Sequence, residues 1–486
     1  MSTLTILLTI IIYYGIQSKY HYWKKRGIPG SKPTIFLGNI GETLLMKRSL
    51  GEVLTDIYNN YPILPFVGIF ISGKPALLVR EPEFVKNITV KDFGHFVDND
   101  SFDKKLDPIL GRHPFFLKGD EWKQSRALAC FTASKMKSIF PLIQENCRQF
   151  VDYIRNQEDA FSSKGIEAKS LCLKYTLKNV TSCAFGVESN TFGDPDDEFL
   201  YLAKRILHPS TKQAIKAFFL KIFPSLFTIL SVKFIPKDVE DKLQNIVSET
   251  LNYRAKHSVV RNDFLYTLAN IKETHSEFTD MDVTANATLF FGDDYEASSI
   301  LLSFILYELA SNPDAQTKLR EELATVFESI LSFDDLQQLN YLDAVVTETL
   351  RKDPPVFALS KTCTKPYTYQ SSSNDGYKNI SKKALVHGLQ HDAKFYQGPE
   401  KFFPERFLGD RKNDLNKYTY LPFGEGPRMC LGLRFGLMQV KAALIHIIKN
   451  FIVTLNNKTQ VPLKLNPTYP MMSPVGGLWL NFSKVG

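Results

Sequence analysis

One cysteine stands in a glycine-rich loop near the C-terminal end of the chain. The loop reads Pro-Phe-Gly-Glu-Gly-Pro-Arg-Met-Cys-Leu-Gly over residues 422–432, with the cysteine at Cys430. Gly424 and Gly426 can adopt backbone conformations that other residues avoid. The apolar periodicity after the loop predicts a helix, whose free N–H groups and positive dipole end would point towards the sulfur. This setting favours a thiolate at Cys430.

A lone thiolate limits the kinds of metal site that the loop can build. No second cysteine or histidine stands beside Cys430, which argues against a zinc site with several such ligands. A single thiolate suits an axial bond to haem iron. Arg428 could then pair with a haem propionate. The alternative is a buried structural thiol in an ordinary glycine-rich loop.

The spacing Phe-Gly-x-Gly-x-Arg-x-Cys-x-Gly over residues 423–432 resembles the signature of the cytochrome P-450 family, the haem-thiolate monooxygenases. All of the defining positions of that signature are present. The resemblance implies that Cys430 is the axial ligand of haem b (iron protoporphyrin IX). It also implies that the loop contributes further cofactor-binding residues, namely Phe423, Gly424, Arg428 and Gly432.

Two further motifs agree with this resemblance in order and spacing. Glu348-Thr-Leu-Arg351 resembles the family's ExxR motif, and Arg406 lies in a Pro-Glu-Arg-Phe segment that resembles its PERF motif. The resemblance implies that these three residues form a buried triad that fixes the fold around the haem. On spacing alone, Glu348 and Arg351 could be an ordinary surface pair of little energetic value.

Trp122 and Arg126 resemble the WxxxR pair of the family, which implies that both bind haem propionates. Without the resemblance, Trp122 would be read as a core residue of an amphipathic helix. Two positions differ from the branch of the family that this chain resembles most. Asn99 and Lys361 stand where that branch usually has arginine. Lysine cannot make the bidentate pair that arginine makes. Propionate binding is therefore expected to depend on Trp122, Arg126, Lys361 and Arg428.

The central helix departs further from the family pattern, which has a small pair, an acid and a threonine. Residues 292–299 read Gly-Asp-Asp-Tyr-Glu-Ala-Ser-Ser. Glu296 supplies the acid, but Ala297 replaces the threonine, and Asp293 and Asp294 replace the small pair. In the family, the threonine hydroxyl and the acid help to deliver protons during oxygen activation, and Ala297 cannot do this.

The expected catalytic residues of this helix are Glu296, Asp294 and Ser298. Ser298 is a poor substitute for the threonine, because it lies about 100° further around the helix. A water molecule or a substrate hydroxyl could fill the role instead. A second class of function therefore stays open, a haem-thiolate isomerase or dehydratase, or a binding protein, that does not activate O2. NADPH consumption and product labelled from O2 would separate the two classes.

Two adjacent aspartates in a buried apolar helix are costly unless they are paired or hydrated. Asp293 and Asp294 could face a water-filled groove or bind a cationic nitrogen of the substrate. The simpler alternative is that one of them points into a hydrated kink.

Residues 1–18 contain no charged side chain, and Lys19, Lys24, Lys25 and Arg26 follow. As a helix, this run would extend about 27 Å. It predicts an N-terminal transmembrane anchor, with the downstream chain held in the cytoplasm by the positive-inside rule. A cleaved signal peptide and a buried core helix are the alternatives. Residues 19–34 are basic and contain Pro29 and Pro33, which predicts a short, stiff hinge.

The remaining residues, 35–486, are expected to form one catalytic domain, mainly α with small β-sheets. Of the 486 residues 44% are hydrophobic and 23% are charged, which excludes a disordered or coiled-coil chain. The net charge of +8 is a weak bias without dense basic runs, so no nucleic acid partner is expected. The pattern predicts a hairpin over 69–79, one long helix over 286–310, a helix over 341–352, strands between 356 and 391, and a C-terminal hairpin near 474–480.

The resemblance is closest to the insect microsomal branch that handles xenobiotics. It implies an endoplasmic reticulum enzyme on the cytosolic face that inserts one oxygen atom from O2 into a lipophilic molecule. NADPH would act only indirectly, through a flavoprotein reductase, with cytochrome b5 as a further candidate partner. Lys123, Arg126, Arg434 and Lys441 would surround the face where the reductase docks, although each could be an ordinary solvated residue. The substrate pocket would draw on residues 101–116, 218–227, 290–294, 356–359 and 474–475.

Overall fold

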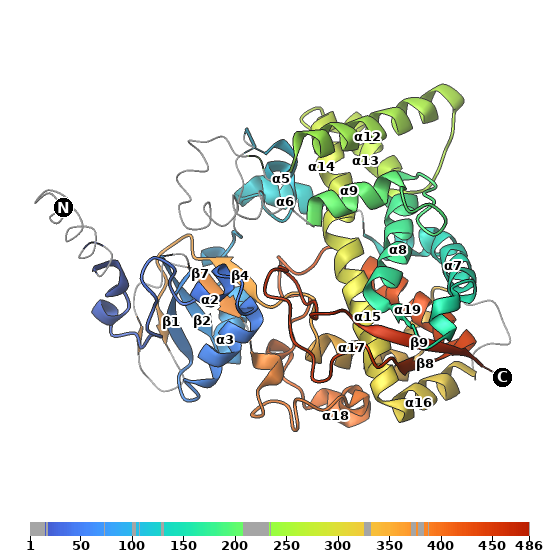
Figure 1. Cartoon of the computed structure of the whole chain (residues 1–486). Coiled ribbons are helices and arrows are strands. Elements are labelled where there is room, and N and C mark those ends of the chain that lie inside the picture. The colour runs from blue at the N-terminus through green and yellow to red at the C-terminus, as the bar shows by residue number, and fades with distance from the viewer. Residues whose placement is uncertain are drawn as a thin grey trace, which may run out of the picture.

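The computed structural model describes residues 15, 18–71, 73–99, 104–105, 107–127, 131–207, 233, 235–324, 332–370, 376–377, 383–386 and 388–485. These residues are mainly helical with small sheets, which confirms the predicted fold class. A sheet-containing end and a larger helical end lie next to each other, and α15 runs through the middle of the helical end (Figure 1).

Helices make up most of the described chain. In chain order they are α2 (Gly41–Leu44), α3 (Leu50–Asn59), α4 (Pro82–Lys86), α5 (Pro108–Arg112), α6 (Gly119–Ala127), α7 (Ala133–Arg155), α8 (Ala168–Val180), α9 (Glu198–Leu207), α12 (Lys237–His257), α13 (Phe264–Thr274), α14 (Asp280–Leu289), α15 (Tyr295–Ser311), α16 (Pro313–Ala324), α17 (Asn340–Lys352), α18 (Gly409–Asn413) and α19 (Leu433–Asn450).

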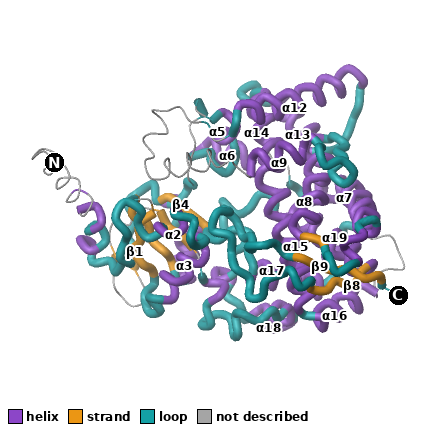
Figure 2. The backbone as a smooth tube through the Cα atoms, viewed as in Figure 1, coloured by secondary structure: helices purple, strands orange, loops and turns teal. Residues whose placement is uncertain are grey.

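The largest sheet has the strand order β1 (Phe66–Ile71), β2 (Lys74–Val79), β7 (Lys383–Val386) and β4 (Leu359–Thr362). β1 and β2 form the predicted antiparallel hairpin, with Gly73 in the left-handed region at φ 74°. β7 runs parallel to β2 and antiparallel to β4. Figure 2 shows these strands at one end of the molecule. Two short strands, β5 (Tyr369–Gln370) and β6 (Gly376–Tyr377), pair separately.

A third sheet corrects the prediction for the C-terminus. β9 (Trp479–Lys484) pairs with β8 (Phe451–Leu455) and with β3 (Ile166–Glu167), not with a strand inside 474–480. Gly476 and Gly477 both have a φ of 81°, so they turn the chain into β9 rather than closing a local hairpin.

The long buried helix predicted over 286–310 is present, but it is not regular throughout. A turn of π-helix over Phe290–Asp294 separates α14 from α15. Every residue of α15 is buried except Ala297 and Ser311. Because Ser311 is the last residue of the helix, Ala297 is the one interior position of α15 that protein atoms do not fully cover.

The basic, proline-containing segment expected to act as a hinge lies against β1. The indole N–H of Trp23 donates to the Ile69 carbonyl at 2.9 Å, and the ring is 2% exposed. A Cβ atom at Gly68 would lie 2.6 Å from that ring, so the close approach requires glycine. In the described part of the chain, no helix is long and apolar enough to cross a membrane. The anchor predicted over 1–18 lies outside the described residues, apart from Gly15 and Ser18.

Candidate active site

The loop that carries Cys430 is held in a fixed shape by its own backbone. The Cys430 N–H donates to the Phe423 carbonyl at 2.8 Å, and Gly424 and Gly426 have φ values of 71° and 77°. A Cβ atom at Gly426 would collide with the Thr89 carbonyl, so only glycine fits there. Among the cysteines that the structure describes, Cys430 is exposed and the other four are buried.

The environment of the Cys430 thiol differs from the one predicted. Although Cys430 has an exposed surface, the protein atoms around it desolvate the thiol and raise its pKa to about 11. The Gly432 N–H acts in the opposite direction, as the helix N-terminus was predicted to do, but Asp294 and Asp293 add to the increase. The protein alone therefore does not stabilise a thiolate, because desolvation outweighs the helix. A bound metal ion would have to supply that stabilisation.

Three cations gather close to this loop. Arg428 donates to the Val97 carbonyl at 2.9 Å and to the Leu117 carbonyl at 2.7 Å, and its side chain is 2% exposed. Burial, together with Arg428 and Arg126, lowers the pKa of Lys361 to about 7. Burial lowers the pKa of Arg428 to about 10, and Asp98, 3.7 Å away, only partly offsets this effect. These lowered pKa values indicate a site that gains stability when an anion binds.

The other residues expected at the propionates lie in the same place. The guanidinium of Arg428 stacks over Trp122, 4.1 Å from the ring centroid. Lys361 donates to the side-chain oxygen of Asn99 at 3.0 Å, so the two positions that depart from the related branch bind each other. An exposed thiol in a rigid loop, beside cations that lack full neutralisation, fits haem with its two propionates. Trp122, Arg126, Lys361 and Arg428 would hold the propionates, and Cys430 would bind the iron.

The acid of the central helix is buried and paired. Glu296 is 0% exposed, and one of its carboxylate oxygens accepts from Lys169 of α8 at 2.7 Å and from the Tyr469 hydroxyl. Its other oxygen has no hydrogen-bond partner. Sequence reasoning missed Lys169 and Tyr469, since Tyr469 is 173 positions from Glu296 and no local pattern joins them.

Asp294 and Ser298 bind α19, the helix that follows the cysteine loop. The Gln439 side-chain amide donates to Asp294 at 2.6 Å and to the Ser298 hydroxyl at 3.0 Å, and Ser298 lies 3.3 Å from Asp294. Burial raises the pKa of Asp294 to about 7. The three predicted catalytic residues therefore fall into two groups, because Glu296 faces α8 whereas Asp294 and Ser298 face α19.

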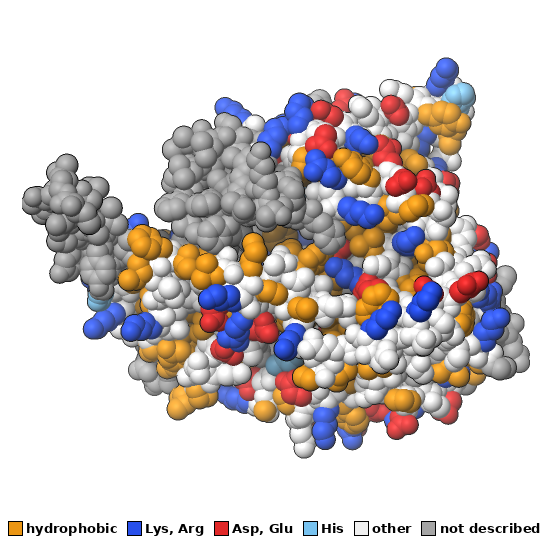
Figure 3. Space-filling model, viewed as in Figure 1, with side chains coloured by type: hydrophobic (Ala, Val, Ile, Leu, Met, Phe, Trp, Pro, Cys, Tyr) orange, Lys and Arg blue, Asp and Glu red, His pale blue; other side chains and the backbone are white. Residues whose placement is uncertain are grey.

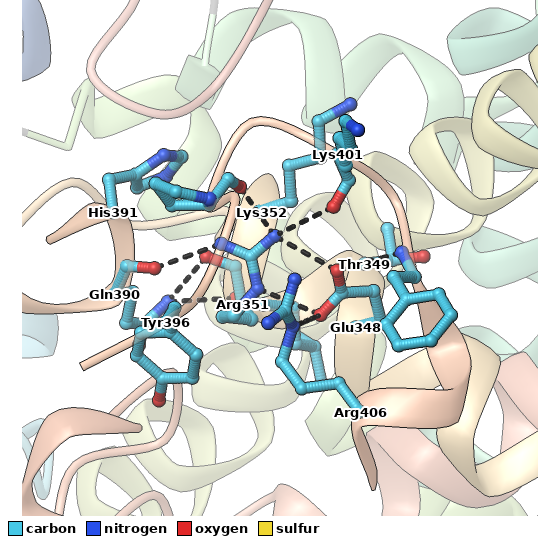
Figure 4. A network of polar contacts seen from close by, with 12 residues as sticks. Glu348, Thr349, Arg351, Lys352, Gln390, His391, Tyr396, Lys401 and Arg406 are labelled. Carbon is cyan, nitrogen blue, oxygen red and sulfur yellow. Dashed lines mark hydrogen bonds and ion pairs between the residues drawn. The ribbon is translucent and has the colours of Figure 1, made fainter. Parts of the chain in front are cut away.

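The predicted triad lies together at the end of α17 (Figure 4). Glu348 accepts two hydrogen bonds from Arg351, at 2.8 and 2.9 Å, and both side chains are fully buried. Arg406 approaches the same carboxylate at 3.5 Å. Arg351 also donates to the backbone carbonyls of Gln390 and Pro399. The network thus ties α17 to the irregular segment that leads into the Cys430 loop.

The structure changes the interpretation of several other predicted residues. Lys441, expected on the docking face, is buried and forms an ion pair with Asp343 of α17. Lys123 and Arg434 are exposed, and Arg126 is half-buried. Phe290 and Phe291, expected in the substrate pocket, are buried in an aromatic cluster with Phe131, Phe264 and Phe185. Residues 101–103, 106 and 218–227 lie outside the described chain.

Comparisons with known proteins give matches over nearly the whole chain. The Cytochrome P450 family model matches residues 28–480. Cytochrome P450 6j1 of Blattella germanica is 36% identical over 488 residues, covering 99% of this chain and 96% of that protein. Cytochrome P450 6k1 of the same species is 33% identical over 507 residues, with coverage of 99% and 96%. Probable cytochrome P450 6a19 of Drosophila melanogaster is 34% identical over 495 residues, with coverage of 99% and 97%.

Proposed function

Because the chain belongs to the cytochrome P450 family, it is a haem-thiolate monooxygenase, and we propose that it oxidises lipophilic small molecules at the endoplasmic reticulum membrane with electrons from an NADPH-dependent flavoprotein reductase. Bound haem supplies the redox chemistry of oxygen activation. The observation that carries the proposal is the exposed Cys430 in a rigid loop beside the buried cations Arg428 and Lys361.

The role of Cys430 is tested by spectroscopy of the reduced protein with carbon monoxide. We expect the red-shifted Soret band of a thiolate-ligated haem, and we expect Cys430→Ala to abolish it. Cys147→Ala is the matched control, because the Cys147 thiol is buried against the Tyr175 hydroxyl at 3.2 Å, away from the loop. A band that survived Cys430→Ala would contradict the ligand assignment.

Proton supply is the proposed task of Glu296. Its fully buried carboxylate holds two donors on one oxygen, while the other oxygen is left free to accept a proton. Lys169 is 15% exposed and so connects this carboxylate to solvent. Asp294 and Ser298 hold the neighbouring turn of the helix on Gln439. Ala297 contributes no hydroxyl, so proton delivery is expected to depend on Glu296.

Membrane attachment is supported by exposed apolar residues near the start of the described chain. Ile35, Phe36, Leu45 and Met46 are 44–53% exposed, and Ile63 is 93% exposed. Figure 3 shows hydrophobic side chains over the sheet-containing end of the molecule. Lys24, Lys25 and Arg26 are exposed in the same segment, where they could meet anionic lipid head groups. This surface would supplement the N-terminal anchor proposed for residues 1–18.

The cytosolic orientation is tested with a glycosylation reporter. Asn457-Lys-Thr459 is an acceptor sequence, and Asn457 is exposed in the turn after β8. In insect cells we expect no glycan at Asn457, since glycosylation takes place in the lumen. A variant directed into the lumen by a cleavable signal peptide should acquire that glycan. A glycan on the native chain would contradict the proposed topology.

The reductase partner is supported by Lys123 on α6 and Arg434 on the first turn of α19, which are both exposed. A flavoprotein with an acidic surface would meet these charges. Turnover in the presence of reductase, NADPH and labelled O2 should give a product that carries one labelled oxygen. A normal carbon monoxide spectrum without NADPH consumption on any lipophilic substrate would refute the oxidative part of the proposal.

A further inference from the structure

Part of the central helix is exposed, although most of it is buried. Asn286, Leu289, Asp294 and Ala297 are partly exposed, and Asp293 is exposed. Asp293 and Asp294 lie in the π-turn that joins α14 to α15. Among the described residues between 281 and 310, Asp293 is the most exposed.

Asp293 lies on the turn that packs against α19, the helix that follows the Cys430 loop. Its neighbour Asp294 accepts from Gln439 of α19 at 2.6 Å, and a Cβ atom at Gly436 would lie 3.5 Å from the same carboxylate. Asp293 and Cys430 are both exposed. The next acids along the helix are already engaged, Asp294 with Gln439 and Glu296 with Lys169. Asp293 is therefore the carboxylate of this helix that a substrate beside the haem would meet.

The contact of Asp293 with His113 does not neutralise its charge. Nε2 of His113 lies 3.5 Å from the carboxylate of Asp293, and the side chain of His113 is 4% exposed. Nδ1 of His113 accepts the Phe115 N–H at 3.3 Å, so the ring proton sits on Nε2 and points to Asp293. Burial lowers the pKa of His113, which keeps this ring neutral near pH 7.

His113 therefore gives Asp293 a neutral hydrogen-bond donor and not a cationic partner. We propose that Asp293 selects substrates that carry a cationic nitrogen, which it would bind as an ion pair beside the haem. This inference rests on the proposed monooxygenase function. A neutral apolar substrate would displace water from Asp293 without offering it a hydrogen bond or a charge. The resulting desolvation cost means that the same carboxylate disfavours binding of such molecules.

The experiment compares two ligands of the same shape in the haem-loaded protein. One is a phenylbutyl trimethylammonium ion, and the other is the hydrocarbon in which carbon replaces the nitrogen. The quaternary nitrogen has no lone pair, so it cannot bind the iron, and its charge does not change with pH. Dissociation constants are measured by equilibrium dialysis and by the shift of the Soret band. We expect the ammonium ion to bind about tenfold more tightly, which corresponds to about 1.4 kcal/mol.

Three variants assign that preference to Asp293. Asp293→Asn should abolish the preference, and Asp293→Glu should keep most of it. Asp314→Asn is the matched control, because it removes one negative charge from an exposed position at the start of α16, and it should leave the ratio unchanged.

Two results would overturn the inference. One is equal binding of the two ligands by the native protein, which needs no variant. The other is an Asp293→Asn protein that keeps the native ratio of the two dissociation constants. If the spectrum of the ligand-free haem changed in that variant while the ratio stayed the same, the carboxylate would act on the haem and not on the ligand. Failure of the proposed function would give a different result. In that case the native protein, when reduced and exposed to carbon monoxide, would not show the red-shifted Soret band.

Discussion

Replacing Glu348 by glutamine should destabilise the whole protein, although the side chain keeps its size. Glu348 accepts from both Arg351 and the Phe403 N–H, and Arg406 lies 3.5 Å away. The substitution removes the one negative charge from between two buried guanidinium groups. Arg351 is 0% exposed and Arg406 is 8% exposed, so neither can recover its hydration without local opening.

The expected loss follows from the cost of leaving a buried charge without its partner, about 3–5 kcal/mol. The unfolding entropy is about 2.1 cal/mol/K per residue, so a chain of 486 residues has about 1 kcal/mol/K. Glu348→Gln should therefore lower Tm by about 3–5 °C. The irregular segment before the Cys430 loop should loosen first, because Arg351 binds the Gln390 and Pro399 carbonyls there.

The assay is thermal unfolding of the haem-loaded protein, followed by circular dichroism and by loss of the Soret band. Glu83→Gln is the matched control, because Glu83 forms an exposed pair with Lys86, and such pairs contribute about 0–1 kcal/mol. The control should shift Tm by less than about 1 °C. An equally small shift for Glu348→Gln would refute the claim that this network stabilises the fold.

Three further predictions concern the central helix. Asp294→Asn should raise Tm by about 2 °C more at pH 8 than at pH 5. The pKa of Asp294 is raised to about 7, so its ionisation destabilises the native state as the pH rises through that value. An equal effect of the substitution on Tm at both pH values would contradict the argument that burial raises this pKa. Ala297→Thr should raise the product formed per NADPH and lower peroxide release, whereas unchanged coupling would mean that another group already replaces the hydroxyl. Lys169→Met should slow turnover and increase its solvent deuterium isotope effect while leaving substrate dissociation constants unchanged, and a change confined to those constants would remove Lys169 from the proton route.

The motifs that could be predicted from the sequence are those whose members are close together or follow a fixed spacing. The Cys430 loop is one, and Glu348 with Arg351 is another. Their chemistry depends on local backbone shape, which glycine spacing and helical periodicity reveal. Lys441 shows the limit of this approach, because periodicity identifies a helix but not which face another helix covers. Asp343 of α17 lies against that face and pairs with Lys441.

The π-turn explains why positions on the central helix could not be predicted. An extra residue in the turn over Phe290–Asp294 changes the face to which each later residue points. Phe290 and Phe291, at the start of the turn, pack in the core, while Asp293, near its end, is exposed. The period of 3.6 residues expected of apolar positions in a regular α-helix does not reveal this change of face. His113 carried no sequence signal either, since it meets Asp293 only through the packing of α5 and α14 against each other.

The packing of Trp23 on Gly68 determines where a shortened protein can begin. Trp23 fills a space that the missing side chain of Gly68 leaves open, and its indole binds the Ile69 carbonyl. Removal of residues 1–18 for expression would leave this plug in place. Removal of all residues before Ile35 would expose β1, the edge strand of the largest sheet, to solvent. We expect such a protein to self-associate through this exposed edge. The plug also fixes the position at which the chain enters the catalytic body, because Trp23 is held against β1.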